Sequence, residues 1–303
     1  MAHATPRLNI TSVPGFFAQD LPETDPFLFT HEKSNFGLLD SFNMDLFPAT
    51  PSIIGLELVY GTPWDRFKDA ITALNLDAPE GTSYRVLFLA RHGQGHHNVA
   101  EASFGKASWE EHWARQDGDG NVVWFDSELT EVGIQEARYA NAAWKLQLAN
   151  GAPLPQSFYS SPLQRACRTL EITWGDIVLD KDDIPKPLIR EKLRETLGIH
   201  TCDRRHSRSA IAAKFPSFRI EEGFTENDEL FNPRVRETNE ERRARLALAL
   251  EEIFSTDESI YITISAHSAA IMSILSALGH RTFELKTGGI LPVVVKVTTE
   301  QNI

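Results

Sequence analysis

The chain has 303 residues, 42% of them apolar, and a formal net charge of −12 at pH 7. This length and apolar content suit one large α/β domain, or two smaller ones, with a substantial core. The acidic balance argues against non-specific binding to nucleic acid or to an anionic membrane surface, because no strong basic field is present to attract a polyanion. A site for a small anion must therefore be built locally.

Cysteine content points to a reducing compartment. Only Cys167 and Cys202 occur, which is too few for a disulfide framework. The first seven residues lack the apolar segment of a secretory signal, and no apolar stretch approaches the roughly 18 residues that a membrane helix requires. We therefore expect a cytoplasmic protein that does not insert into a membrane.

The first 60 residues are rich in Pro, Asn, Asp and Phe and show no regular periodicity. Phe16, Phe17, Phe27 and Phe47 lie in this stretch. Because disordered tails are usually poor in aromatic residues, we expect these side chains to dock on the rest of the protein. The sequence thus predicts an N-terminal extension, residues 1–80, that wraps the core, followed by a main domain, residues 81–303.

Helical and strand patterns alternate along the rest of the chain. Ser161 and Pro162 are typical of an N-cap and a first helical residue, so we expect a helix to open there. Apolar spacing predicts further helices at 64–74, 96–106, 108–116, 129–149, 240–254 and 269–278, and strands at 84–90, 156–160, 187–190, 259–265 and 291–297. The alternation predicts a three-layer α/β/α fold with a mainly parallel sheet.

Charged and nucleophilic side chains follow three of the predicted strands. Arg91 and His92 end the first, Arg165 follows the strand at 156–160, and His267 follows the strand at 259–265. Because the carboxyl ends of parallel strands meet at one edge of a sheet, we expect all four to share one site. Two guanidiniums and two imidazoles suit a tetrahedral phosphate dianion, and His92 at the strand tip is the natural nucleophile.

These residues lie in motifs that resemble branch 1 of the histidine phosphatase superfamily, the phosphoglycerate mutase-like group. Arg91-His92-Gly93 followed by Asn98 resembles the signature RHG-x-x-x-x-N. Residues 126–137 resemble D-x-x-L-T-x-x-G-x-x-Q-A, with the Gln displaced by one position, and residues 161–166 resemble S-x-L-x-R-A. His267 stands where the family's second histidine follows a β-strand. The four motifs keep the family's order.

The resemblance implies a phosphoglycerate mutase-like fold with helical cap insertions, here about 94–128 and 198–238, within a histidine phosphatase-like catalytic domain. It implies that His92 attacks phosphorus and becomes a phosphohistidine. Arg91, Arg165 and His267 would hold the phosphoryl oxygens, and Asn98 would support the loop and contribute to phosphate binding.

The family also places a carboxylic acid at the end of a triplet such as Leu-Arg-Glu, which Leu193-Arg194-Glu195 matches. By resemblance, Glu195 protonates the leaving oxygen and later activates water. Family members usually have a Gly four residues after this acid, whereas Gly198 comes three residues after Glu195, so Glu191 is an alternative. Ser268 replaces the Gly that usually follows the second histidine, and it could add a donor to the phosphate pocket or narrow it.

The other branch of the superfamily, the acid phosphatases and phytases, is disfavoured. That branch shows RHG-x-R-x-P and a His-Asp pair. This chain instead has Gln94-Gly95-His96-His97 after the RHG tripeptide, and Ser268 after His267.

Two metal sites compete with this interpretation. The possible zinc ligands are His92, His96, His97 and His267. Histidines four apart lie on one helical face, but the nearby arginines would repel a cation, so His96 and His97 more simply line the pocket rim or face solvent. Residues 117–128 imitate a calcium loop, yet Val122 replaces the required sixth-position Gly, and a β-turn is the better account. We expect no metal and no cofactor.

The stretch 190–208 is rich in cations, namely Arg190, Lys192, Arg194, Arg204, Arg205 and Arg208. It fits a solvated face, or equally a cap segment that meets the remaining anionic groups of a substrate. Cys202 within it is expected to be unreactive packing.

The expected function is metal-independent hydrolysis of a small phosphate monoester, with a small phosphorylated molecule as the partner. A phosphoglycerate-type phosphomutase shares every catalytic residue and is the first alternative. A non-catalytic phospho-ligand binding protein is the second. The intact set of Arg91, His92, Arg165 and His267 argues against the second alternative, because a decayed site usually loses a member.

Overall fold

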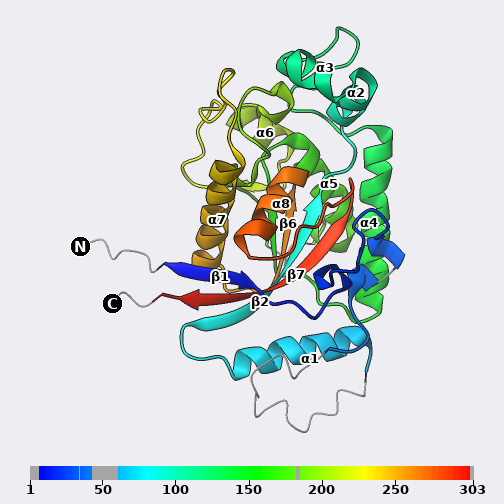
Figure 1. The fold of residues 1–303 in the computed structure, drawn as a ribbon, viewed down its shortest axis with the longest axis vertical. Coiled ribbons are helices and arrows are strands. Elements are labelled where there is room, and N and C mark those ends of the chain that lie inside the picture. The colour runs from blue at the N-terminus through cyan, green and yellow to red at the C-terminus, as the bar shows by residue number, and fades with distance from the viewer. Residues whose placement is uncertain (1–6, 34, 43–60, 182–184, 301–303) are drawn as a thin grey trace, which may run out of the picture.

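A seven-stranded sheet forms the centre of the molecule (Figure 1). The computed structural model describes residues 7–33, 35–42, 61–181 and 185–300. The strands are Leu8–Ser12 (β1), Thr82–Arg91 (β2), Ser157–Ser160 (β3), Leu188–Ile189 (β4), Arg219–Ile220 (β5), Tyr261–Ala266 (β6) and Ile290–Thr299 (β7). Their order across the sheet is β1-β7-β2-β6-β3-β4-β5. Strands β2 to β6 pair in parallel, whereas β7 is antiparallel to both β1 and β2, so the prediction of a mainly parallel sheet is confirmed.

Helices cover both faces of the sheet and complete three layers (Figure 1). They are Pro63–Leu76 (α1), His96–Phe104 (α2), Lys106–Glu111 (α3), Glu131–Ala149 (α4), Gln164–Trp174 (α5), Arg208–Lys214 (α6), Asn239–Thr256 (α7) and Ser268–Ala277 (α8). Val86 and Phe88 of β2 pack in one core with α1, α4 and α5, while Leu87 and Leu89 pack in the other with α7 and α8. This alternation follows from the two-residue period of a strand, and it fixes which face each helix covers.

Four of the eight α-helices in the described ranges, α1, α4, α6 and α7, start with a hydrogen bond to a Ser or Thr side chain at the N-cap. The Thr130 hydroxyl accepts the Gly133 N–H at the start of α4, and Thr238 does the same for Glu241 in α7. The predicted start of α5 is wrong: the helix begins at Gln164, after an extended Leu163. Ser161 lies outside the helix, and its Oγ accepts the Leu163 N–H and contacts His267, as described below. None of the helices in the described ranges is both long and apolar enough to cross a membrane.

The N-terminal segment contributes a strand that the sequence did not predict. β1 lies at the edge of the sheet and pairs with β7 from Leu8 opposite Thr299 to Ser12 opposite Val295. Phe16 and Phe17 are fully buried, as expected, but Phe27 is 66% exposed, so its predicted docking is wrong. Phe47 lies outside the described residues.

An aromatic cluster holds α2 and α3 above the sheet, at the top of Figure 1. It contains Trp109 and Trp124, with Phe104 and Trp113 packed against them. The second expected cap segment, 198–238, is less regular, with α6 as its α-helix and β5 as part of the main sheet. Buried Arg205 satisfies backbone carbonyls of this segment directly, donating to those of Thr225 and Asn227. A segment whose carbonyls are bonded in this way does not need helical hydrogen bonds.

Candidate active site

The four side chains predicted at strand ends converge at the carboxyl edge of the parallel strands. Arg91 ends β2, His92 follows it, His267 follows β6, and Arg165 is the second residue of α5. The ring centroids of His92 and His267 lie 5.1 Å apart, and Arg165 Nε lies 3.3 Å from His92 Nε2. Arg91 is near enough for its charge to act on both imidazoles. The structure therefore brings these four groups into one buried cluster.

The lone-pair nitrogen of His92 is Nε2, which accepts a hydrogen bond from Arg165 Nε at 3.3 Å. The Nδ1 atom of His92 lies 2.7 Å from the carbonyl oxygen of Gly93. A carbonyl only accepts, so Nδ1 carries the proton and Nε2 keeps its lone pair. Burial, together with the charges of Arg165 and Arg91, lowers the pKa of His92 well below 6.5. The imidazole is thus neutral at pH 7, with Nε2 facing the guanidinium of Arg165.

Arg165 is fixed by a partner that the sequence analysis did not identify. Its Nη2 donates to Asp203 Oδ1 at 2.9 Å, and its Nη1 donates to the Cys202 carbonyl at 2.6 Å. Both Arg165 and Asp203 are buried, with exposures of 1% and 3%. A buried guanidinium needs such a counter-ion, and the pair aims the Nε edge at His92.

Three buried nitrogens around His92 have no hydrogen-bond partner among the described residues: Arg91 Nε, His97 Nδ1 and His267 Nδ1. His267 is held through its other nitrogen, which lies 2.8 Å from Ser161 Oγ. Arg91 is held by donation from Nη1 to the Leu285 carbonyl at 2.7 Å. Buried polar groups in native proteins are nearly always paired, so a cluster of unpaired ones indicates a place for a ligand rich in hydrogen-bond acceptors.

Two glycines allow the catalytic loop to cross the start of α4. A Cβ built on Gly93 would lie 2.3 Å from the Gly133 carbonyl oxygen, and a Cβ on Gly133 would lie 2.1 Å from the Gln94 carbonyl oxygen. The loop is also tied down by the Gly93 N–H, which donates to Thr169 Oγ1 at 3.0 Å. Gly93 of the RHG tripeptide and Gly133 of the segment 126–137 therefore lie where the two motifs make close backbone contact.

Glu195 lies at this edge of the sheet, and Glu191 does not share its environment. Glu195 Oε2 accepts the Ala269 N–H at the start of α8, at 3.0 Å. Burial raises the pKa of Glu195, and the Asp203 carboxylate raises it further, against the lowering effects of the Ala269 N–H and of Arg165. Glu191 instead forms ion pairs with Arg194 and Arg205. The geometry therefore favours Glu195 as the acid over Glu191.

The two remaining predicted residues, Asn98 and Ser268, lie on α2 and α8. Asn98 Oδ1 accepts the Gly95 N–H at 2.9 Å and so closes the turn into α2. Ser268 is the first residue of α8, between His267 and the N–H that binds Glu195.

Within the cation-rich stretch 190–208, Arg190, Arg194 and Arg205 are held in ion pairs inside the protein, whereas Arg204 and Arg208 are exposed. Arg194 is fully buried against Asp228 and Glu191, and Arg205 is 2% exposed. Arg190 pairs with Glu221. Internal ion pairs balance the charges of Arg190, Arg194 and Arg205, so these arginines have a structural role beside the site. Cys202 is buried, which raises the pKa of its thiol and agrees with unreactive packing.

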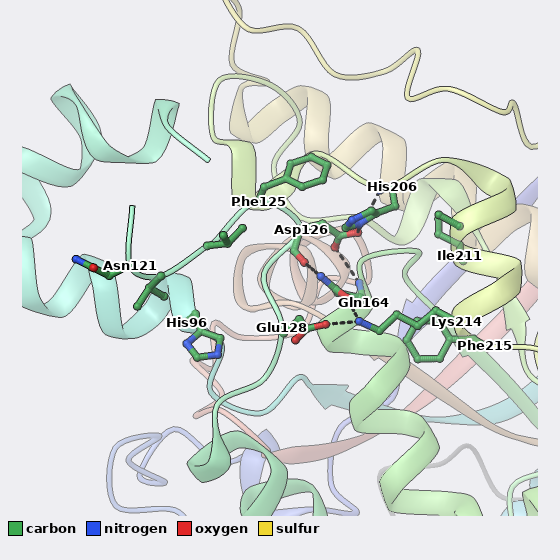
Figure 2. A pocket seen from close by; sticks show the side chains of 13 residues that line it. His96, Asn121, Phe125, Asp126, Glu128, Gln164, His206, Ile211, Lys214 and Phe215 are labelled. Carbon is green, nitrogen blue, oxygen red and sulfur yellow. Dashed lines mark hydrogen bonds and ion pairs between the residues drawn. The ribbon is translucent and has the colours of Figure 1, made fainter. Parts of the chain in front are cut away.

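A cavity of about 480 Å³ lies beside the segment that contains Asp126 (Figure 2). His96 lines it, as do Phe125, Gln164 and Lys214, but none of Arg91, His92, Arg165 and His267 does. Its charged groups are already paired, Asp126 with His206 and Lys214 with Glu128. The four histidines of the zinc alternative do not form a group of closely spaced ligand atoms among the described residues.

The described residues hold one group of three side chains whose ligand atoms lie within 4.8 Å of one another: His200, Cys202 and Asp203. Asp203 already pairs with Arg165 and Arg236, and two guanidiniums at this distance would repel a cation. The group does not suit a metal. The supposed calcium loop is a turn, in which Asp119 Oδ1 accepts the N–H groups of Asn121 and Val122.

Comparisons with known proteins show the family of the chain. The Histidine phosphatase superfamily (branch 1) matches residues 87–288. A "Probable phosphoglycerate mutase" of Arthroderma benhamiae is 43% identical over 98% of this chain and 87% of its own length. "Probable phosphoglycerate mutase PMU1" of Saccharomyces cerevisiae is 32% identical over 96% of this chain and 97% of its own length. Among solved structures, Bacillus stearothermophilus YhfR covers 69% of this chain and 90% of its own, at 21% identity and a TM-score of 0.43. The chain belongs to branch 1 of the histidine phosphatase superfamily.

Proposed function

We propose that the protein is a metal-independent phosphatase that hydrolyses a small phosphate monoester through a phosphohistidine on His92. The observation that carries this proposal is the pair of unpaired buried nitrogens, Arg91 Nε and His267 Nδ1, beside His92 and Arg165. A phosphoryl group brings oxygens that accept hydrogen bonds from each of these directions. Arg91 and Arg165 supply the positive charge that offsets the charge of the transferring group.

The reaction proceeds in two displacements. His92 Nε2 attacks phosphorus, the N–P bond forms as the ester P–O bond breaks, and the leaving oxygen takes its proton from Glu195. Water then transfers a proton to the Glu195 carboxylate as its oxygen attacks phosphorus. The N–P bond breaks, inorganic phosphate leaves and His92 is restored. Burial raises the pKa of Glu195, so this carboxyl keeps its proton to a higher pH than an exposed one, which suits a group that acts first as an acid.

We also propose that residues 81–303 form the catalytic domain, with residues 1–80 as an extension that wraps it. Within this division, the segments 94–128 and 198–238 form the cap over the site. The cytoplasm is the location we propose, in keeping with two free, buried cysteines.

Trapping the intermediate tests the mechanism. The protein is mixed with p-nitrophenyl phosphate, quenched in alkali, which preserves phosphohistidine, and mapped by mass spectrometry. We expect one phosphoryl group on His92 in the parent and none in His92→Ala, with full labelling of the matched control His96→Ala. Equal hydrolysis by the parent and His92→Ala would refute the proposal and favour a phospho-ligand binding protein with adventitious turnover.

A phosphomutase is the second candidate, favoured by the names of the two relatives above. It would use the same His92 but return the phosphoryl group to another hydroxyl. The two are separated by incubating the protein with 3-phosphoglycerate, with and without 2,3-bisphosphoglycerate. Release of inorganic phosphate without 2-phosphoglycerate supports the phosphatase, and conversion to 2-phosphoglycerate without phosphate release supports the mutase.

A further inference from the structure

His97 is a third imidazole beside the proposed nucleophile. It is the second residue of α2 and 8% exposed. Its ring centroid lies 5.5 Å from that of His92, and its charge, if present, would act on His267 as well. The sequence analysis placed His96 and His97 together at the rim or in solvent. The structure gives them different surroundings: His96 lines the 480 Å³ cavity, whereas the ring of His97 lies beside that of His92.

Contacts with Ser127 and Gly95 set the position of the His97 ring. Its backbone N–H donates to Ser127 Oγ at 3.0 Å. Its Nδ1 is packed so closely on Gly95 that a Cβ there would lie 2.6 Å from it. Nδ1 is enclosed at that contact without a hydrogen-bond partner among the described residues. The nitrogen left to meet a ligand is therefore Nε2, at the other end of the ring.

A purely structural role explains this residue poorly. A buried imidazole with an unpaired nitrogen costs free energy that an apolar side chain of similar volume would not. Burial and the nearby Arg165 lower the pKa of His97 well below 6.5, so the ring is neutral at pH 7. With Nδ1 enclosed and unpaired, the proton belongs on Nε2, where a ligand oxygen can accept it.

We propose that His97 is a further substrate-binding residue, which donates a hydrogen bond from Nε2 to an oxygen of the phosphoryl group. This inference rests on the proposed function for the identity of the ligand, but not on turnover. His97 thus joins Arg91, Arg165 and His267 around the phosphoryl oxygens, on the side of the site formed by α2.

Inorganic phosphate binding, measured by calorimetry and as competitive inhibition of p-nitrophenyl phosphate hydrolysis, tests the proposal. We expect His97→Leu, which keeps the volume but removes the donor, to weaken phosphate binding by about 10–100-fold, the range for a hydrogen bond to a charged group. His97→Gln, which keeps a donor, should recover part of the loss. Gly95→Ala, whose new Cβ displaces the ring, should weaken binding although His97 is intact. The matched control His96→Leu should bind phosphate like the parent.

The outcomes separate this inference from the proposed function. Parent-like phosphate binding by folded His97→Leu, with folding checked by thermal unfolding, overturns the role of His97 even if His92 is still phosphorylated. If His97→Leu does not fold, equal binding by Gly95→Ala and the parent overturns it instead. If the parent forms no phosphohistidine but binds phosphate in a His97-dependent way, the phosphatase proposal fails and the role of His97 stands.

Discussion

Replacing Gly93 by Ala should damage catalysis far more than stability. The new Cβ would lie 2.3 Å from the Gly133 carbonyl oxygen, which belongs to the backbone of α4 and cannot swing aside. The two segments must separate by roughly 0.7 Å before the contact even reaches 3.0 Å, and His92 is the adjacent residue. Because misplacement of a catalytic group by about 1 Å can cost on the order of 100-fold in rate, we expect kcat/KM to fall about 10–100-fold. Overpacking should lower the free energy of unfolding by only about 1–3 kcal/mol.

The assay is p-nitrophenyl phosphate hydrolysis at a temperature where both proteins are folded, with urea unfolding in parallel. Gly175→Ala is the matched control, since a Cβ there meets nothing within 4 Å and its backbone is right-handed helical. We expect the control to keep full activity and to gain about 0.4–1 kcal/mol. Gly133→Ala separates the same two segments from the other side. In free-energy terms, the loss of kcat/KM in the double variant should therefore be smaller than the sum of the losses in the two single variants. Unchanged kcat/KM in folded Gly93→Ala would show that the crossing does not position His92.

Three further outcomes follow from the site and its surroundings. Ser161→Ala removes the partner of His267 Nε2, so we expect kcat to fall about 5–30-fold, in line with one lost positioning hydrogen bond of about 1–2 kcal/mol, and a full rate would contradict that role. Because the pKa of Glu195 is raised, chiefly by burial, kcat/KM should fall as pH rises through it; Glu195→Gln should abolish this limb and cost about 100-fold or more on an alkyl phosphate, and a parent-like pH profile would exclude the acid role. Asp228→Ala leaves buried Arg194 without its bidentate partner and should destabilise the fold by about 3–5 kcal/mol in urea unfolding, whereas a loss under 1 kcal/mol would mean that water reaches Arg194.

The strands and helices of the core were predictable because their signals are local. The run at 84–90 is apolar on both faces, as a strand covered by two helical layers must be, and the structure extends it only to Thr82–Arg91. The amphipathic pattern at 240–254 became α7, Asn239–Thr256, with its start fixed by a capping box at Thr238. The convergence of strand ends then followed from the parallel order of β2, β6 and β3.

What the sequence analysis missed depends on partners far along the chain. β5 has two residues and exists because β4 offers it an edge, so no local period predicts it. Asp203 carries no motif, yet it holds Arg165 from a position 38 residues away. The stretch 190–208 was interpreted through its cations alone. The acidic residues Glu191, Asp203 and Asp228 in and near that stretch were the available signal for a buried ion-pair network.

Burial also explains how three imidazoles and two guanidiniums can lie together in one site. If all five were charged, their repulsion would open the site, and a protonated His92 would have no lone pair for phosphorus. Burial and the two guanidiniums lower the pKa values of His92, His97 and His267, so the imidazoles stay neutral and only the arginines are charged. Asp203 offsets part of that charge at Arg165, and an incoming dianion can neutralise the positive charge that remains in the site. The walls that exclude water from the site are therefore also what keeps His92 nucleophilic, and loosening them would weaken phosphate binding and nucleophilicity together.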